Sequence, residues 1–218
     1  MINISKMSKY YGEYPAVIDV SFNISKGESI GLLGPNGAGK STTMKVMTGY
    51  TPPTSGNVNI GGHDIIKNSI DARRLIGYLP ESVPLYTDMT VRDYLKYMGS
   101  LRGMNKNISK RVDEVISLTS LNQYKDVLIS KLSKGYRQRT GIAQAILHKP
   151  KILILDEPTI GIDPVQVVET RKLIQNLGED HTLILSSHIL PEVTSICKRV
   201  LVIHEGKIVA DDTPENLS

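Results

Sequence analysis

The chain has few cysteines and no long apolar stretch, and both absences narrow its possible functions. Cys197 is the only cysteine, which excludes a disulfide within the chain and leaves too few thiolate ligands for a zinc site. No apolar run approaches the roughly 18 residues that a helix needs to cross a bilayer. The N-terminal stretch lacks the apolar core of a signal peptide. We therefore expect a soluble, intracellular protein, with any membrane span supplied by a partner.

A strong excess of one charge is also missing. Lys and Arg number 26 against 22 Asp and Glu, a formal net charge of +4, and no arginine-rich tract gathers the basic residues. This mild excess of positive charge is compatible with binding a nucleotide or an anionic membrane surface, and equally compatible with no particular partner. Because the basic residues are not gathered in a tract, we expect no nucleic acid partner. A length of 218 residues allows one large domain or at most two small ones. No linker, low-complexity segment or internal repeat divides the chain.

The strongest chemical signal is the stretch GPNGAGKST, which matches the pattern G-x-x-x-x-G-K-[ST]. Its glycines let backbone N–H groups turn inward around an anion. Lys40 adds a charge for the outer phosphates, and Ser41 adds a hydroxyl ligand for Mg²⁺. By rough residue frequencies, a chain of this length matches by chance about once in 100 cases. The residues predicted to hold the polyphosphate are Gly34, Pro35, Asn36, Gly37, Ala38, Gly39, Lys40, Ser41 and Thr42.

The elements on either side of this loop fit phosphate binding. Residues 28–33 form an apolar run that predicts a buried strand, and residues 41–48 predict a helix that ends at Gly49. The helix N-terminus would then direct its dipole and its free N–H groups at the phosphates. The alternative interpretation is a glycine-rich turn with a lysine at the surface, which would not require a buried strand before the loop and a helix after it.

The rest of the chain alternates strands and helices. An aromatic turn is predicted over residues 10–15, and two amphipathic helices lie between residues 81 and 132, the first opened by a capping pattern at Thr90 and Asp93. The other predicted strands cover residues 2–8, 16–24, 58–60, 76–79, 152–155, 182–185, 199–203 and 207–210. The other predicted helices cover residues 69–75, 134–147 and 164–177. This order predicts an α/β fold with a mainly parallel sheet, an N-terminal antiparallel portion and a helical insertion.

Three titratable side chains follow predicted core strands. Asp156 and Glu157 end the apolar strand 152–155, and the carboxyl ends of parallel strands are where ligands gather. Adjacent residues point in different directions, so one carboxylate can face a metal and the other an attacking water. Two acids that cap a strand in solvent are the alternative. His188 ends another strand and could donate to the terminal phosphate, although a structural histidine is the usual explanation for a lone one.

A second helix start is predicted in the octet LSKGYRQR, residues 132–139. Ser133 is placed as an N-cap and Gly135 lies in the first turn, which suits an anion because little side-chain bulk covers the free N–H groups. On the residues alone, an ordinary capped helix explains this pattern at least as well.

This octet resembles the signature motif LSGGQxQR of the ABC transporter ATPases, with more basic residues at Lys134 and at Tyr136-Arg137. GPNGAGKST resembles their Walker A motif, and ILILDEP resembles their Walker B motif with Glu157 at the catalytic glutamate. Residues 161–163 are similar to the D-loop of that family. The motifs occur in the family's order across essentially the whole chain.

The resemblance implies a fold, cofactors and site residues. It implies a P-loop NTPase (RecA-like) core with an N-terminal antiparallel β subdomain and an α-helical subdomain inserted at about 82–148, in one domain over 1–218. The implied cofactors are ATP and Mg²⁺. The implied catalytic residues are Glu157 and His188, the metal ligands are Ser41, Glu81 and Asp156, and the nucleotide contacts outside Walker A are Tyr11, which would stack on adenine, Ser133, Gly135 and Gln138.

The resemblance also implies partners. Two ATP molecules would lie between two subunits, with Walker A from one chain and the signature from the other, so a second ATPase subunit, in a homodimer, is expected. Integral membrane permease subunits are the other expected partners, with the chain cytoplasmic and peripheral at the inner face of the cell membrane. The apolar loop with Pro84, Leu85, Tyr86 and Met89 is a candidate docking surface for them, or ordinary packing under the helical insertion.

One position departs from the family pattern. The Q-loop glutamine should follow residues 77–80, and Glu81 stands there. An ionised carboxylate only accepts hydrogen bonds and adds negative charge near the γ-phosphate, but it can still ligate Mg²⁺, so we expect activity to survive. The stretches GYLPES and PLYTDMTV resemble the corresponding sequences of exporter ATPases that have separate membrane subunits.

Three alternatives to an exporter subunit make different demands on the sequence. A non-transport ABC ATPase that acts on nucleic acid or the ribosome would need a coiled-coil insertion or a tandem ATPase domain, which this sequence does not show. A regulatory module without turnover would not need Glu157 and His188. Other P-loop enzymes, such as small-molecule kinases, do not explain LSKGYRQR.

Overall fold

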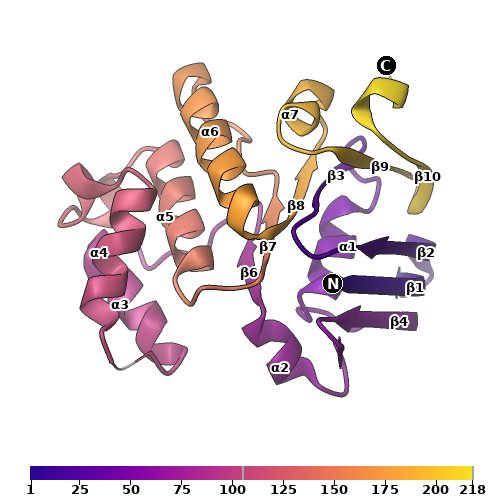
Figure 1. The fold of residues 1–218 in the computed structure, drawn as a ribbon, viewed down its shortest axis with the longest axis horizontal. Helices are drawn as coiled ribbons and strands as arrows, with labels where there is room; N and C mark the ends of the chain where they lie inside the picture. The colour runs from indigo at the N-terminus through magenta and orange to yellow at the C-terminus, as the bar shows by residue number, and fades with distance from the viewer. Residues whose placement is uncertain (105, 218) are drawn as a thin grey trace.

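A computed structural model describes residues 1–104 and 106–217, and the strands in these residues form two sheets (Figure 1). The four-stranded sheet is antiparallel, in the order β2-β1-β4-β5, and the six-stranded sheet has the order β10-β9-β3-β8-β7-β6. The first sheet contains β1 (Ile2–Tyr11), β2 (Tyr14–Ile24), β4 (Ser55–Ile60) and β5 (His63–Asp64). The second contains β3 (Ser29–Leu33), β6 (Ile76–Leu79), β7 (Ile152–Asp156), β8 (Thr182–Ser187), β9 (Arg199–His204) and β10 (Lys207–Asp212).

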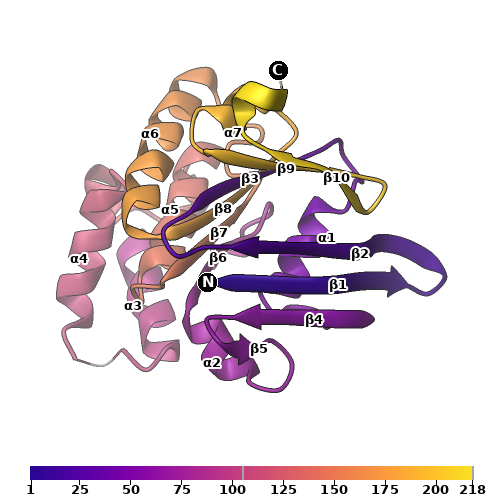
Figure 2. The same cartoon turned by 45° about the vertical axis from the view of Figure 1, so that its right-hand side comes forward.

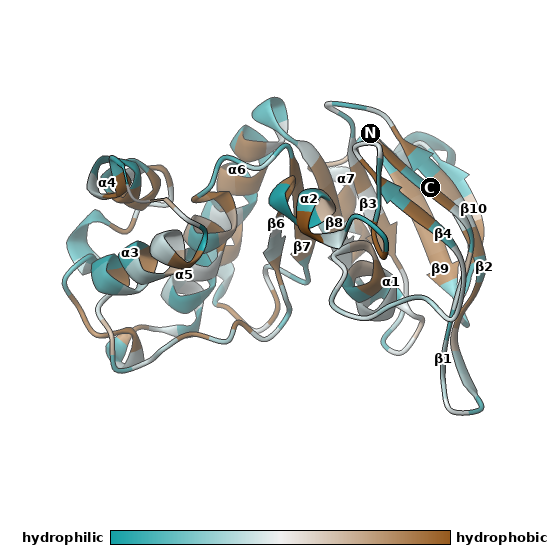
Figure 3. Cartoon of the chain, turned by 90° about the horizontal axis from the view of Figure 1, so that it is seen from below, coloured by the Kyte–Doolittle hydropathy of each residue, from teal (hydrophilic) through white to brown (hydrophobic). Residues whose placement is uncertain are grey.

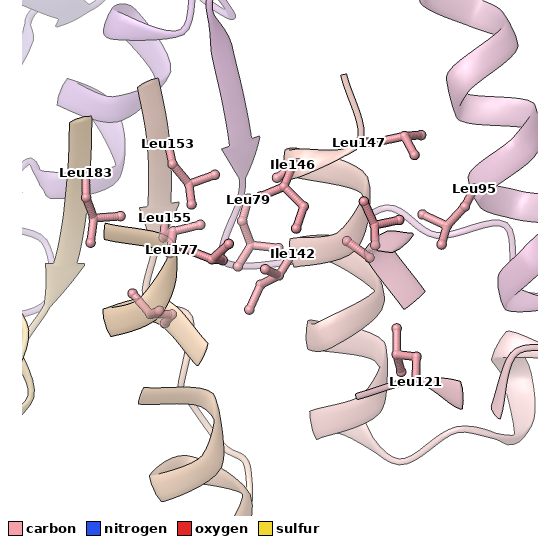
Figure 4. Close-up of a cluster of buried hydrophobic side chains, with 14 of the residues drawn as sticks. Leu79, Leu95, Leu121, Ile142, Ile146, Leu147, Leu153, Leu155, Leu177 and Leu183 are labelled. Atoms are coloured by element: carbon pink, nitrogen blue, oxygen red, sulfur yellow. The ribbon is translucent and has the colours of Figure 1, made fainter. Parts of the chain in front are cut away.

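The larger sheet is parallel except at β10, which pairs antiparallel with β9. Strand β7 is buried on both faces because its side chains alternate between two apolar clusters. Ile152 and Ile154 join the cluster shared with the antiparallel sheet, whereas Leu153 and Leu155 face the helices α5 (Lys134–Ile146) and α6 (Pro164–Asp180) (Figure 4). The carboxyl end of β7 therefore presents Asp156 from the middle of the core.

Helix α1 lies between the two sheets, α2 lies beside β5 and packs in the same apolar cluster, and the remaining helices cover the opposite face of the larger sheet or extend beyond it (Figure 2). The helices are α1 (Lys40–Met47), α2 (Ser69–Arg74), α3 (Val91–Leu101), α4 (Ile108–Leu118), α5 (Lys134–Ile146), α6 (Pro164–Asp180) and α7 (Leu190–Thr194). Short 3-10 helices are η1 (Asn122–Tyr124), η2 (Ile129–Lys131) and η3 (Pro214–Leu217). Helices α3 and α4 pack on α5 through buried residues such as Leu95 and Val112, and show hydrophilic stretches on their outer faces (Figure 3).

The expected α/β architecture with a parallel sheet and an N-terminal antiparallel part is confirmed. The predicted turn over residues 10–15 was too long, because Tyr11 and Tyr14 are paired strand residues and only Gly12 and Glu13 form the turn. Aromatic side chains favour strands, so the hairpin extends to these tyrosines. Helix α6 continues past the expected end at Leu177, and the short helix α7 was not predicted.

Candidate nucleotide site

The phosphate loop connects β3 to α1, as the sequence predicted. Gly37 and Gly39 have left-handed φ angles of 81° and 107°. A Cβ on Gly39 would lie 2.6 Å from the Ala16 carbonyl oxygen, so only glycine fits there. Lys40 is the first residue of α1, and its buried Nζ donates to the carbonyls of Gly34 (2.8 Å) and Pro35 (3.1 Å). The loop thus positions a buried cation at a helix N-terminus.

Glu157 joins this loop to His188. Its buried carboxylate lies with Oε1 3.3 Å from Lys40 Nζ and with Oε2 3.0 Å from His188 Nδ1. The backbone at Glu157 has a φ of 47°, a left-handed conformation that non-glycine residues adopt at some cost. The structure therefore brings together the lysine of the phosphate loop and the two residues predicted to be catalytic.

Asp156 is buried beside Glu157 at the end of β7. Its Oδ1 accepts from Ser186 Oγ at 2.6 Å, and Ser186 Oγ accepts from the Glu157 N–H at 2.9 Å. Burial raises the pKa of the Asp156 carboxyl, although hydrogen bonds from Ser186 and Ser41 act in the other direction. A nearby cation would offset the cost of holding this carboxylate ionised in the interior.

A cleft of about 430 Å³ opens over the phosphate loop and contains most of the predicted site. We call it the phosphate-loop cleft. It is lined by Tyr11, Tyr14, Ala16, Asn36, Gly37, Gly39, Lys40, Ser41, Thr42, Glu81, Glu157 and Ile160. Tyr11 is half exposed, and Lys9 Nζ lies 5.3 Å from the centroid of its ring. Gly34, Pro35 and Ala38 do not line the cleft, and Pro35 and Ala38 line a neighbouring hollow together with Asn36 and Gly37.

A second hollow of about 540 Å³ adjoins this cleft, and we call it the groove. It is lined by Ser41, Lys45, Tyr50, Tyr78, Pro80, Glu81, Ser82, Val83, Pro84, Arg102, Gly141, Gln144 and Asp156. The groove thus brings together the three predicted metal ligands, Ser41, Glu81 and Asp156. In the part of the chain that the structure describes, no cluster of three or more His, Cys, Asp or Glu side chains could hold a metal. One hydroxyl and one or two carboxylates fit Mg²⁺, which usually keeps waters and phosphate oxygens as its other ligands.

The octet at the start of α5 lies outside the phosphate-loop cleft. Ser133 is the N-cap, as predicted, and its Oγ accepts from the Tyr136 N–H at 3.4 Å. A Cβ on Gly135 would overlap the Gln166 side chain. Gln138 is buried, and its Nε2 has no hydrogen-bond partner among the described residues. It lines a separate hollow of about 310 Å³ with Glu81, Lys134 and Arg137.

The family profile described as ABC transporter matches residues 17–160, about two thirds of the chain. The chain belongs to the ABC transporter family. It is an ATP-binding chain and an ATPase of that family, and the expected P-loop NTPase fold is confirmed.

Relatives of this ABC chain include ATP-binding proteins named for linearmycin resistance and for lantibiotic transport. It is 38% identical to the linearmycin resistance ATP-binding protein LnrL of Bacillus subtilis, over 100% of this chain and 70% of LnrL. It is 36% identical to the lantibiotic transport ATP-binding protein SrtF of Streptococcus pyogenes, over 100% of this chain and 94% of SrtF. A solved ATP-binding subunit of an ABC transporter superposes with a TM-score of 0.88 at 27% identity, covering 100% of this chain and 91% of that one.

Several residues that hold the ABC site together were not predicted. Ser186 links Asp156, at the end of β7, to Glu157, which follows it, and the buried Glu192 of α7 links three segments of the chain. Glu192 Oε2 accepts from Thr159 Oγ1 (2.9 Å) and Ser187 Oγ (2.8 Å), and its Oε1 lies 3.0 Å from Arg171 Nη2. These hydrogen bonds fix the loop after Glu157 against the strand end that precedes His188.

In residues 1–104 and 106–217, no helix is both long and apolar enough to span a bilayer.

Proposed function

We propose that the chain energises a membrane exporter as an ATP-hydrolysing homodimer. This proposal rests on the separation, within one chain, between the phosphate-loop cleft and the start of α5. The phosphate-loop cleft contains Lys40, Ser41 and Glu157, whereas Ser133 and Gly135 lie outside it. Two chains in opposite orientation would bring the Ser133 hydroxyl and the free N–H groups at the start of α5 to the phosphates of the partner's nucleotide.

Hydrolysis in this proposal uses residues that already touch one another. Water attacks the γ-phosphorus in line, the Glu157 carboxylate accepts its proton, and the bond from the γ-phosphorus to the bridging oxygen breaks so that ADP leaves. His188 orients Glu157 through Nδ1, and Lys40 moves from its carbonyl acceptors and Glu157 to the phosphate oxygens. Ser41, Asp156 and Glu81 would hold Mg²⁺, which would supply positive charge to offset that of the phosphates. Tyr11 stacks on adenine at the mouth of the cleft, and Tyr14 lines the same mouth.

An ATP-dependent cross-link tests the paired arrangement. Cysteines at Asn36 and Ser133, both exposed, would face each other across the dimer and form a disulfide only with nucleotide present. The native Cys197 does not compete, since burial raises its pKa to about 12. Cysteines at Asn68 and Ser133 are the control pair and should not cross-link. A chain that never links through Asn36 and Ser133 in ATP would refute the opposed dimer.

The membrane subunit is proposed to dock at the groove and at the loop that follows Glu81. Pro84 and Tyr86 are exposed there, whereas Leu85 and Met89 are half-buried and pack on the helical layer. The Tyr86 ring lies 5.6 Å from Tyr97, centroid to centroid, which leaves an exposed aromatic pair beside the groove. This arrangement would place the chain peripherally at the inner face of the membrane, with residues 82–148 as a helical subdomain that moves with the partner.

Co-purification tests the docking surface. A tagged chain should retain an integral membrane subunit when isolated from detergent-solubilised native membranes, and Tyr86→Glu should lose it while ATP binding stays intact. Val209→Glu, at an exposed apolar site on β10, is the control and should retain the subunit. Retention by Tyr86→Glu would remove this loop from the interface.

A further inference from the structure

A basic patch lies where α4 begins and α5 ends. We define the basic patch as Arg102, Lys106, Lys110, Arg111 and Lys149. Its centre is a hollow of about 340 Å³, whose charged and titratable lining residues are Lys106, Lys110, Arg111, Glu114, His148 and Lys149. Glu114 is the only acidic residue in that lining, so positive charges outnumber negative ones around the hollow.

Most of the charge in the basic patch is free to act on a partner. Arg111 is committed to the fold, because its Nε and Nη2 donate to the carbonyls of Leu147 (2.9 Å) and Ile146 (2.7 Å). Lys106, Lys110 and Lys149 are exposed, and within residues 1–104 and 106–217 they form no ion pair. Three long, unpaired cations therefore surround the hollow.

The local field is positive enough to affect a neighbouring histidine. His148 Nε2 lies 3.1 Å from Arg102 Nη1 and 3.0 Å from the Ile76 carbonyl oxygen. Burial and the charges of Arg102 and Arg111 lower the pKa of His148 to about 4. The histidine is neutral near pH 7, so it adds no charge of its own.

The basic patch continues from the proposed docking groove. Arg102 lines the groove and also contacts His148 at the hollow. His148 in turn contacts the carbonyl of Ile76, the first residue of β6, so the groove and the patch adjoin through Arg102 and His148. Leu101, 62% exposed, and Tyr97, 41% exposed, lie one turn apart on α3 and lead up to Arg102. Exposed cations beside an apolar residue and a tyrosine are the composition of surfaces that rest at a membrane interface.

We propose that the basic patch, with Leu101 and Tyr97 beside it, contacts anionic phospholipid headgroups next to the membrane subunit. A bilayer surface fits the patch because the three lysines are exposed and unpaired within the described chain, and the exposed Tyr97 and Leu101 beside them add an aromatic and an apolar contact. The inference rests on the proposed function only for its orientation toward the membrane. The contact would hold the chain at the bilayer independently of ATP.

Vesicle binding by the full chain tests the inference without a membrane subunit. Each lysine near an anionic surface contributes about fivefold to the partition coefficient. The triple variant Lys106→Gln, Lys110→Gln, Lys149→Gln should therefore bind on the order of 100-fold more weakly to vesicles with about one third phosphatidylglycerol. Raising the salt from about 0.1 M to about 0.5 M should release the wild-type chain.

A control of equal charge separates the patch from net charge. Lys26→Gln, Lys172→Gln and Lys198→Gln remove three other exposed lysines and should leave vesicle binding within about twofold of the wild type. Equal loss in both triple variants, or no preference of the wild type for anionic over phosphatidylcholine vesicles, overturns the inference. So does an RNA oligonucleotide that displaces the vesicles from the patch, because it would assign the surface to nucleic acid. ATP binding, measured in parallel, should be unchanged in both variants, so failure here is distinct from failure of the proposed function.

Discussion

Replacing Glu157 by glutamine gives the most direct test of the proposed hydrolytic site. Glutamine keeps the shape of the side chain and one carbonyl oxygen, but it removes the negative charge between Lys40 and His188. Lys40 keeps its bonds to the Gly34 and Pro35 carbonyls, so the variant does not leave a buried cation without partners. We therefore expect Glu157→Gln to fold and to bind nucleotide.

The distance between the Lys40 ammonium and the Glu157 carboxylate sets the size of the expected change in ATP affinity. At 3.3 Å and an effective dielectric constant of about 20, the Lys40–Glu157 attraction is roughly 5 kcal/mol. That figure is an upper bound on the net attraction between the two groups, because forming the ion pair also removes both charges from water. Release of even about 1.4 kcal/mol of it would tighten ATP binding about tenfold. Loss of the proposed general base should slow hydrolysis by about 10²-fold to 10⁴-fold.

Tighter binding and slow hydrolysis together should trap the closed dimer. Light scattering of Glu157→Gln in ATP and Mg²⁺ should report a stable dimer, whereas the wild type should dimerise only transiently. Glu205→Gln, in the exposed β9–β10 turn, is the matched control and should behave as the wild type. A Glu157→Gln chain that stays monomeric in ATP, or that hydrolyses ATP at the wild-type rate, would refute the reasoning.

Three other perturbations address the loop, the basic patch and the core. Lys40→Ala should abolish ATP binding in a fluorescent-nucleotide titration, and micromolar affinity would contradict this expectation. The same variant should lower the free energy of unfolding by about 3 kcal/mol, because it leaves the buried Glu157 without its cation. By NMR, His148 should titrate near pH 4, so its contribution to stability is full above about pH 6.5 and is lost as the pH falls toward 4. Arg102→Gln should raise that midpoint, and a wild-type midpoint near 6.5 would contradict the positive field. Gly77→Ala should lower the free energy of unfolding in urea by about 2 kcal/mol, because its Cβ would overlap the Ala145 carbonyl oxygen; an unchanged value would show that β6 and α5 can separate.

The sequence predicts those parts of the fold that depend on local pattern. The run ILIL before Asp156 predicted a buried central strand because both faces of β7 are apolar. The phosphate loop was predicted because its glycines and Lys40 stand at fixed spacing. The hairpin of β1 and β2 was misjudged at Tyr11 and Tyr14, since cross-strand pairing decides where the strands end and no local pattern reports it.

The parts that the sequence does not predict depend on contacts between distant segments. Ser186 bridges Asp156 to the Glu157 backbone only because β7 and β8 are parallel in that register. From the sequence, Glu192 is expected at the surface of a helix. In the structure it is buried and accepts hydrogen bonds from Thr159 and Ser187. The lysines look scattered along the chain, yet folding places Lys149 beside residues 106–111.

The distance between Ser133 and the phosphate-loop cleft has a consequence for how the chain is used in a cell. A site completed by a partner makes turnover second order in the chain at low concentration, so isolated copies consume almost no ATP. Confinement of copies to one membrane surface replaces a three-dimensional search with a two-dimensional one and raises their local concentration. Under the proposed pairing, placement at the membrane would itself decide when the ATPase runs.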